Sequence, residues 1–115
     1  MRIPFSDSAI IASSKLVDYL LDPTHPDGAA KARALARAGF HRAAPDVLER
    51  ALREQHLALD ATAGQRTPYG DKYETTGLLK GPAGVVIVTS VWIVRHGERS
   101  PRLVTVIPRE KKRGA

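Results

Sequence analysis

The clearest hydrophobic pattern in the chain is the run VVIVTSVWIV at residues 85–94, in which β-branched residues dominate and both alternating faces are apolar. Such a pattern is typical of a central strand that is covered on at least one side. Shorter strand-like segments lie at residues 73–79 and 102–108, and LALDA at residues 57–61 is expected to begin an edge strand. The connections GPAG and RHGERSP are too short for parallel crossovers, so we expect an antiparallel sheet of three or four strands.

Helical periodicity characterises the N-terminal half of the chain. Apolar positions spaced by three and four residues predict helices over residues 13–22, 28–38 and 45–57. Tyr19 belongs to the apolar stripe of the first helix, and Asp27 is the expected N-cap of the second. The two patterns together predict an α+β domain with about three N-terminal helices packed on the antiparallel sheet.

The length of 115 residues is that of one domain, which we place at residues 1–108, followed by a basic disordered tail at residues 109–115. The absence of cysteine excludes disulfides and thiolate chemistry and fits a reducing cytoplasm. The chain shows neither a secretory signal nor an apolar run of the length of a membrane helix. We therefore expect a cytoplasmic protein without membrane association.

Charge narrows the choice of partners only moderately. The net charge is +6, and half of it lies in the last seven residues. Excess basic charge favours polyanionic partners such as RNA or an acidic protein, whereas a basic tail is usually a solvated chain end. The body of the domain thus carries a mild cationic bias.

Motifs for metal, nucleotide or hydrolase chemistry are absent from the sequence. There is no glycine-rich phosphate loop, no HExxH and no GxSxG, so we expect neither a metal site nor a cofactor. The four histidines are far apart in sequence. His41 and His56 are expected at exposed helix ends, and His96 in a hairpin loop. Trp92 is expected in the core.

The stretch HPDGAAKARALARAGF, residues 25–40, carries the strongest candidate chemistry. His25 precedes a helix N-terminus, where free N–H groups and the helix dipole favour anions, and an imidazole there can move protons near neutral pH. Lys31 borders the apolar stripe, and Lys31 or Arg33 can bind phosphate. The alternatives, a histidine of a surface turn and a solvated cationic helix face, remain open.

Aromatic residues flank a predicted turn in the C-terminal half. Tyr69 and Tyr73 lie on either side of Gly70, and each can stack a nucleobase or pack at a sheet edge. On the last strand, Arg102 and Thr105 are three residues apart, which predicts opposite faces of the sheet. By the same alternation Thr105 is expected to share a face with Leu103.

Several segments, in order, resemble an uncharacterised family of small bacterial proteins that is described near toxin–antitoxin-type genes. They span roughly residues 3–108 and are IP, KLVDYLLDPTHPDGAAKARALARAGF, TPYGDKY, GLLKGPAG, SVWIV and PRLVTVIP. The arrangement is also similar, more distantly, to the barnase–EndoU–colicin–RelE group of metal-independent ribonucleases. Members of that group pack N-terminal helices against a four-stranded antiparallel sheet.

The second resemblance implies RNA cleavage by attack of the ribose 2′-OH on the adjacent phosphate, with RNA as substrate and a cognate antitoxin as partner. In this scheme His25 is the acid or base, Lys31 and Arg102 stabilise the phosphate, and Tyr69 stacks a base. The candidate catalytic residues are His25, Lys31, Tyr69, Arg102 and Thr105. The candidate RNA-binding residues are Arg33, Thr67 and Tyr73.

A second function class stays open beside the ribonuclease. A basic domain of this size is also expected of a non-enzymatic module that binds an acidic partner protein or RNA.

Overall fold

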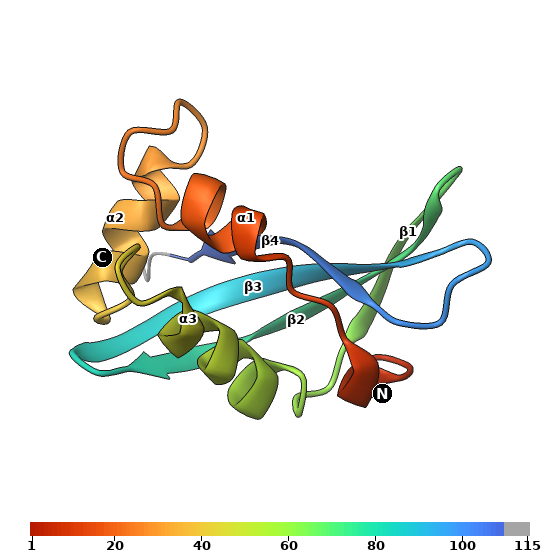
Figure 1. Cartoon of the computed structure of the whole chain (residues 1–115). Coiled ribbons are helices and arrows are strands. Elements are labelled where there is room, and N and C mark those ends of the chain that lie inside the picture. Colours follow the sequence, from red (N-terminus) through yellow and green to blue (C-terminus); the bar gives the residue numbers. More distant parts are fainter. Residues whose placement is uncertain (110–115) are drawn as a thin grey trace, which may run out of the picture.

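The computed structural model describes residues 1–109, and in this part of the chain a short 3-10 turn, Ser6–Ser8, and three longer helical segments precede four strands (Figure 1). The helical segments are α1, Ser13–Lys15, which continues as a π-helical turn over Leu16–Leu20; α2, Ala29–Arg37; and α3, Pro45–Ala51, which continues as a π-helical turn over Leu52–His56. The strands are β1, Thr62–Thr67; β2, Gly70–Gly81; β3, Gly84–Arg95; and β4, Arg102–Pro108.

These elements confirm the α+β class and the antiparallel sheet, with differences in detail. The strands follow the order β1-β2-β3-β4, and each pairs antiparallel with the next. The predicted helices are present but shorter, and only α2 is a regular α-helix over its whole length. The edge strand predicted at residues 57–61 is wrong. Helical hydrogen bonding continues through Leu57, whose N–H bonds to the Leu52 carbonyl at 3.0 Å, and pairing with β2 begins at Thr62.

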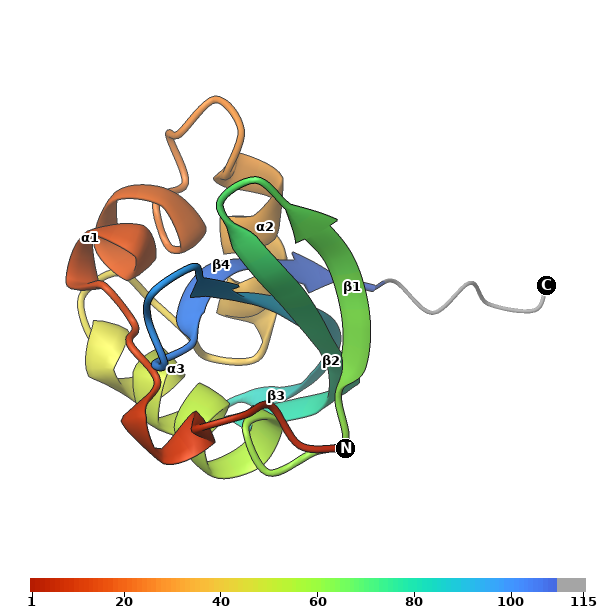
Figure 2. The same cartoon turned by 90° about the vertical axis from the view of Figure 1, so that its right-hand side faces the viewer.

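The hydrophobic core lies between the helices and one face of the sheet (Figures 1 and 2). Leu16, Leu35 and Leu52 bring the three helical segments onto this face, where Trp92 of β3 is at its centre. All four side chains are at most 1% exposed. The prediction that Trp92 belongs to the core is therefore confirmed.

Strand β4 contains a β-bulge that changes which side chains share a face. Thr105 pairs with Val91 and Arg102 with Ile93, so β4 has one residue more than β3 between the two pairs. An extra residue shifts the alternation of the bulged strand. Arg102 and Thr105 therefore lie on the same face, and the prediction that Thr105 shares a face with Leu103 is wrong.

The N-terminal segment covers the outer edge of β4. Ile10 forms a parallel bridge with Arg102. Its N–H donates to the Pro101 carbonyl at 2.8 Å, and its carbonyl accepts from the Leu103 N–H at 3.0 Å. These two backbone hydrogen bonds hold the chain alongside the edge of β4 immediately before α1 begins. This contact fixes the start of α1 next to the strand that carries Thr105.

A chain of hydrogen bonds crosses the core, and it corrects the prediction that His56 is exposed. His56 is 0% exposed. Its Nε2 lies 3.3 Å from the Gly77 carbonyl, which only accepts, so Nε2 carries the proton and Nδ1 accepts from Ser90 Oγ at 2.9 Å. Ser90 Oγ in turn accepts from Trp92 Nε1 at 3.0 Å. Burial lowers the pKa of His56, so the ring is neutral in the folded protein.

Candidate functional site

Tyr19 is the centre of a cluster of polar side chains between α1, α2 and β4. It lies in the π-helical turn Leu16–Leu20 and is half-buried against the edge of the core. The ring of His25 meets it edge-on, with centroids 5.0 Å apart and planes at 80°. Lys31 Nζ lies 5.5 Å and Lys15 Nζ 6.0 Å from the centre of the Tyr19 ring, within the range of cation–π attraction.

The turn between α1 and α2 holds His25 in this position. Asp22 Oδ1 accepts from the N–H of Thr24 at 2.9 Å and from its hydroxyl at 2.7 Å. These bonds lower the pKa of the Asp22 carboxyl and rigidify the turn. At the far end of the turn the backbone of Gly28 packs directly against Tyr19. A Cβ at this position would come within 2.3 Å of the Tyr19 carbonyl oxygen. Glycine is thus required for α2 to start against Tyr19.

The His25 ring holds together the turn that leads into α2. Nδ1 lies 3.0 Å from the backbone nitrogen of Asp27 and 3.1 Å from that of Gly28, and both N–H groups donate to it. An accepting Nδ1 leaves the proton of the neutral ring on Nε2. His25 is therefore a hydrogen-bond donor at Nε2 and has no lone pair there to act as a base. The prediction that Asp27 caps the helix is wrong, since no side-chain cap bond from Asp27 forms at this terminus.

Thr105 approaches the cluster from β4. Its Oγ1 is buried and forms no hydrogen bond of normal geometry with the described residues. It is nevertheless close enough to the Tyr19 phenol that their interaction is the largest cause lowering the pKa of Tyr19. The Lys31 ammonium acts in the same direction, whereas burial and Asp27 oppose it. Phenol, ammonium, imidazole N–H and a hydroxyl with unused capacity thus lie together, a set suited to an anion.

The other sheet residues predicted for the site lie elsewhere. The turn that carries Tyr69 is at the opposite end of the sheet from α2 (Figure 1). Arg102 forms a two-pronged ion pair with Glu98, at 3.0 Å from Nε and 3.2 Å from its terminal nitrogen. Thr67 Oγ1 accepts from the backbone of the same turn and donates to the Gly70 carbonyl at 2.9 Å. None of these three side chains contacts the Tyr19 cluster.

Two further candidates are separate from the cluster as well. Arg33 is exposed on α2, at a shallow hollow that also includes Pro23 and Arg42. Tyr73 pairs with Trp92 on the face of the sheet that the helices cover, and it packs against the core. Tyr73 therefore has the packing role that the sequence left open as an alternative.

Tyr19 itself is the residue that sequence analysis did not select. Its spacing from Leu16 and Leu20 matches an apolar stripe, and that stripe does pack on the core. The sequence signal for a site was indirect. It consisted of an aromatic ring ten residues before the start of α2 and twelve before Lys31, and no known motif joins residues at this spacing.

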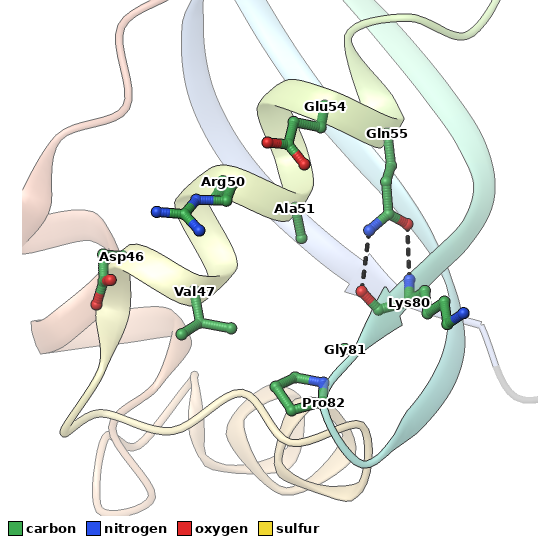
Figure 3. Close-up of a pocket in the computed structure, with 9 residues that line it drawn as sticks. All are labelled: Asp46, Val47, Arg50, Ala51, Glu54, Gln55, Lys80, Gly81 and Pro82. Carbon is green, nitrogen blue, oxygen red and sulfur yellow. Dashed lines mark hydrogen bonds between the residues drawn. The ribbon is translucent and has the colours of Figure 1, made fainter.

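A second hollow lies between α3 and the end of β2, and it has a structural explanation (Figure 3). The Gln55 amide nitrogen donates to the Lys80 carbonyl at 2.9 Å, and its oxygen accepts from the Lys80 N–H at 2.7 Å. Gln55 thereby forms the two hydrogen bonds to the Lys80 backbone that a neighbouring strand would otherwise form at this edge of β2. The remaining polar groups there, such as Arg50 and Glu54, alternate in charge along exposed helix surface.

Within residues 1–109, no group of three or more histidine, aspartate or glutamate side chains is arranged to hold a metal ion. In the same part of the chain, every helix is too short or too polar to span a bilayer.

A family model matches residues 2–110, and it is described as a domain of unknown function, DUF6883. The match covers nearly the whole chain, so the protein belongs to the DUF6883 family. No curated protein and no solved structure matches it.

Proposed function

We propose that this domain is a metal-independent ribonuclease, the toxin of a bacterial toxin–antitoxin-type pair, with its site at the Tyr19 cluster. One observation carries the proposal. His25 and Lys31, which are candidates for their chemistry, and Thr105, which is a candidate from the resemblance, lie around one tyrosine ring although they are distant in sequence.

Each side chain has a role that its geometry allows. The Tyr19 phenolate, favoured by Thr105 and Lys31, takes the proton of the ribose 2′-OH. The 2′-oxygen then bonds to phosphorus, and the bond from phosphorus to the 5′-oxygen breaks. His25 Nε2–H donates to a non-bridging phosphate oxygen, where negative charge develops, while the single proton of the Thr105 hydroxyl stays with the Tyr19 oxygen.

Lys31 completes the proton balance. Its ammonium gives a proton to the departing 5′-oxygen and later recovers one from Tyr19, so the products are a 2′,3′-cyclic phosphate and a 5′-hydroxyl. This distribution makes His25 a donor rather than the base, because its Nδ1 is occupied by two backbone N–H groups.

A non-enzymatic module is the second candidate, and an exposed apolar patch favours it. Leu78 is 60% and Val85 54% exposed, and both extend from the face of the sheet opposite the core. Exposed patches of this kind mark partner-binding surfaces. A cognate antitoxin that covers the patch is compatible with both candidates.

The test compares the purified wild-type domain with Tyr19→Phe and Lys31→Ala on single-stranded RNA. We expect wild type to release fragments with cyclic phosphate ends, and each variant to lose about 100-fold in rate or more. Arg50→Ala, which removes an exposed cation from α3, is the matched control and should cleave as wild type. Circular dichroism checks that all variants fold.

Two outcomes contradict the proposal. Unchanged cleavage by both site variants removes the Tyr19 cluster as the active site. A wild-type domain that cleaves no RNA, is harmless when expressed alone and forms a stable complex with the product of a neighbouring gene supports the interaction module.

A further inference from the structure

The face of the sheet opposite the core carries a row of cations next to the Tyr19 cluster. Strand pairing aligns Lys72, Ile93 and Arg102 across β2, β3 and β4. The next row along β4 contains Val91 and Thr105. Directly paired residues of antiparallel strands point to the same face. The cationic row therefore adjoins the residue that reaches the Tyr19 phenol.

An open hollow of about 580 Å³ lies at the far end of this same face. Ile93 belongs both to the hollow and to the cationic row. The residues that line the hollow are Pro68, Tyr69, Ile93, Arg95, His96 and Glu98. Apolar, aromatic and cationic side chains thus line one hollow, which lies at the end of the sheet away from α2 (Figure 1).

Tyr69 presents an exposed ring on a fixed backbone. Tyr69 is 77% exposed. Thr67 Oγ1 accepts from the Tyr69 N–H at 3.2 Å, and the Tyr69 carbonyl accepts from the His96 N–H at 3.0 Å. The His96 ring donates from Nε2 to the Thr67 carbonyl at 3.2 Å, which fastens the turn to the end of β3. A large aromatic ring that is exposed on a fixed backbone contributes nothing to the core and is available for stacking.

Electrostatics along this path favour an anion. Glu98 is neutralised by its two-pronged pair with Arg102, and this pair lowers the pKa of its carboxyl. Arg95 and Lys72 add positive charge on the same face. Glu74, in the next row of paired residues, adds one negative charge. Cations interleaved with an exposed aromatic ring match a single-stranded nucleic acid, whose bases are free to stack and whose phosphates need neutralising.

We propose that single-stranded RNA binds the end of the sheet away from α2, on the face opposite the core, with one base stacked on Tyr69 in the hollow and its phosphates on Arg95 and Lys72. This inference rests on the proposed function for the fate of the RNA, but its binding surface is separate from the reacting groups. It assigns Tyr69 to substrate binding rather than to catalysis.

The experiment measures binding in the Lys31→Ala background, which keeps the RNA intact. Fluorescence anisotropy follows a labelled single-stranded RNA dodecamer and the same RNA annealed to its complement. We expect tighter binding of the single strand, a loss of about tenfold or more in Tyr69→Ala, and retained binding in Tyr69→Trp, because stacking tolerates any large ring. Arg95→Gln should lower the slope of log K against log salt by about one.

Equal binding of single strand and duplex, or unchanged binding by Tyr69→Ala, overturns this inference. Binding of an acidic protein but not of RNA to this face also overturns it. The two proposals fail separately. Binding that depends on Tyr69, without cleavage by the wild type, removes the ribonuclease and keeps the RNA-binding face. Cleavage by the wild type, together with RNA binding that does not depend on Tyr69, keeps the ribonuclease and removes the RNA-binding face.

Discussion

His25 and Gly28 are joined by a hydrogen bond that makes the imidazole part of the turn before α2. The Gly28 N–H donates to His25 Nδ1 at 3.1 Å. The same nitrogen accepts from the Asp27 N–H at 3.0 Å, so His25 ties together the two residues that precede the helix. With Nδ1 occupied, the neutral ring presents its Nε2–H to a ligand.

This relationship separates the structural role of His25 from its functional role. His25→Ala should lower the free energy of unfolding by about 1 kcal/mol, because two backbone N–H groups before α2 lose their acceptor. His25→Asn should restore most of that stability, because the amide oxygen can accept at the position of Nδ1. Urea unfolding followed by circular dichroism measures both.

RNA cleavage by the same variants then tests the donor role. We expect His25→Asn to be stable yet slow, since its short amide cannot replace the Nε2 donor beside Tyr19. Full activity in His25→Asn would show that His25 acts only by holding the turn before α2.

The phenol of Tyr19 should titrate at lower pH than an ordinary tyrosine. The interaction with Thr105 lowers the pKa of Tyr19 most, and Lys31 lowers it further. Thr105→Val keeps the shape of the side chain and removes the hydroxyl, so we expect the pKa of Tyr19 to rise. The phenolate absorbance of the near-ultraviolet spectrum measures this, with Tyr19→Phe subtracted to remove the other tyrosines.

Activity provides a second readout for the same substitution. If the Tyr19 phenolate is the base, the rising limb of the pH–rate profile should move to higher pH in Thr105→Val, together with the absorbance titration. A displaced titration with an unmoved rate profile would contradict the role of Tyr19 as the base.

Acid should destabilise the domain through His56. Burial lowers the pKa of His56 below its ordinary value of 6.5, so the unfolded chain takes up the proton first as the pH falls. The contribution of the neutral ring is complete above the unfolded pKa and is lost as the pH falls through the folded pKa. Below about pH 6.5 the free energy of unfolding should decrease by at most about 1.4 kcal/mol per pH unit from this group.

His56→Gln is the matched control for this effect. A glutamine side chain can still bond to Ser90 or Gly77 but does not titrate. Denaturant unfolding at about pH 7.5 and about pH 5.5 compares the two proteins. An equal loss of stability with pH in both would assign the acid sensitivity to other groups.

The sequence predicted several parts of the fold because local patterns determine them. The two apolar faces of residues 85–94 predicted a central strand, and Trp92 is fully buried there. Pro68 and Gly70 predicted the turn at which β1 meets β2. For the candidate site, chemistry and place in the chain indicated His25 and Lys31, and the resemblance to the ribonuclease group indicated Thr105; their role in a site stays a prediction.

Other features depended on contacts between distant segments. His56 has the spacing of an exposed helix end, but its ring is buried because Ser90 and Gly77, far along the chain, satisfy both of its nitrogens. Arg102 and Thr105 share a face because one bulged residue in β4 reverses the alternation, and no residue type in that strand signals the bulge.

What the sequence alone determined is therefore the type of each main element and the chemical groups available to a site. The tertiary structure decided that Tyr19, assigned by its periodicity to packing, is the point where those groups meet. The physical reason is that periodicity reports which side of an element is apolar. It does not report which residues from a turn, a helix and a bulged edge strand come within a few ångströms of each other.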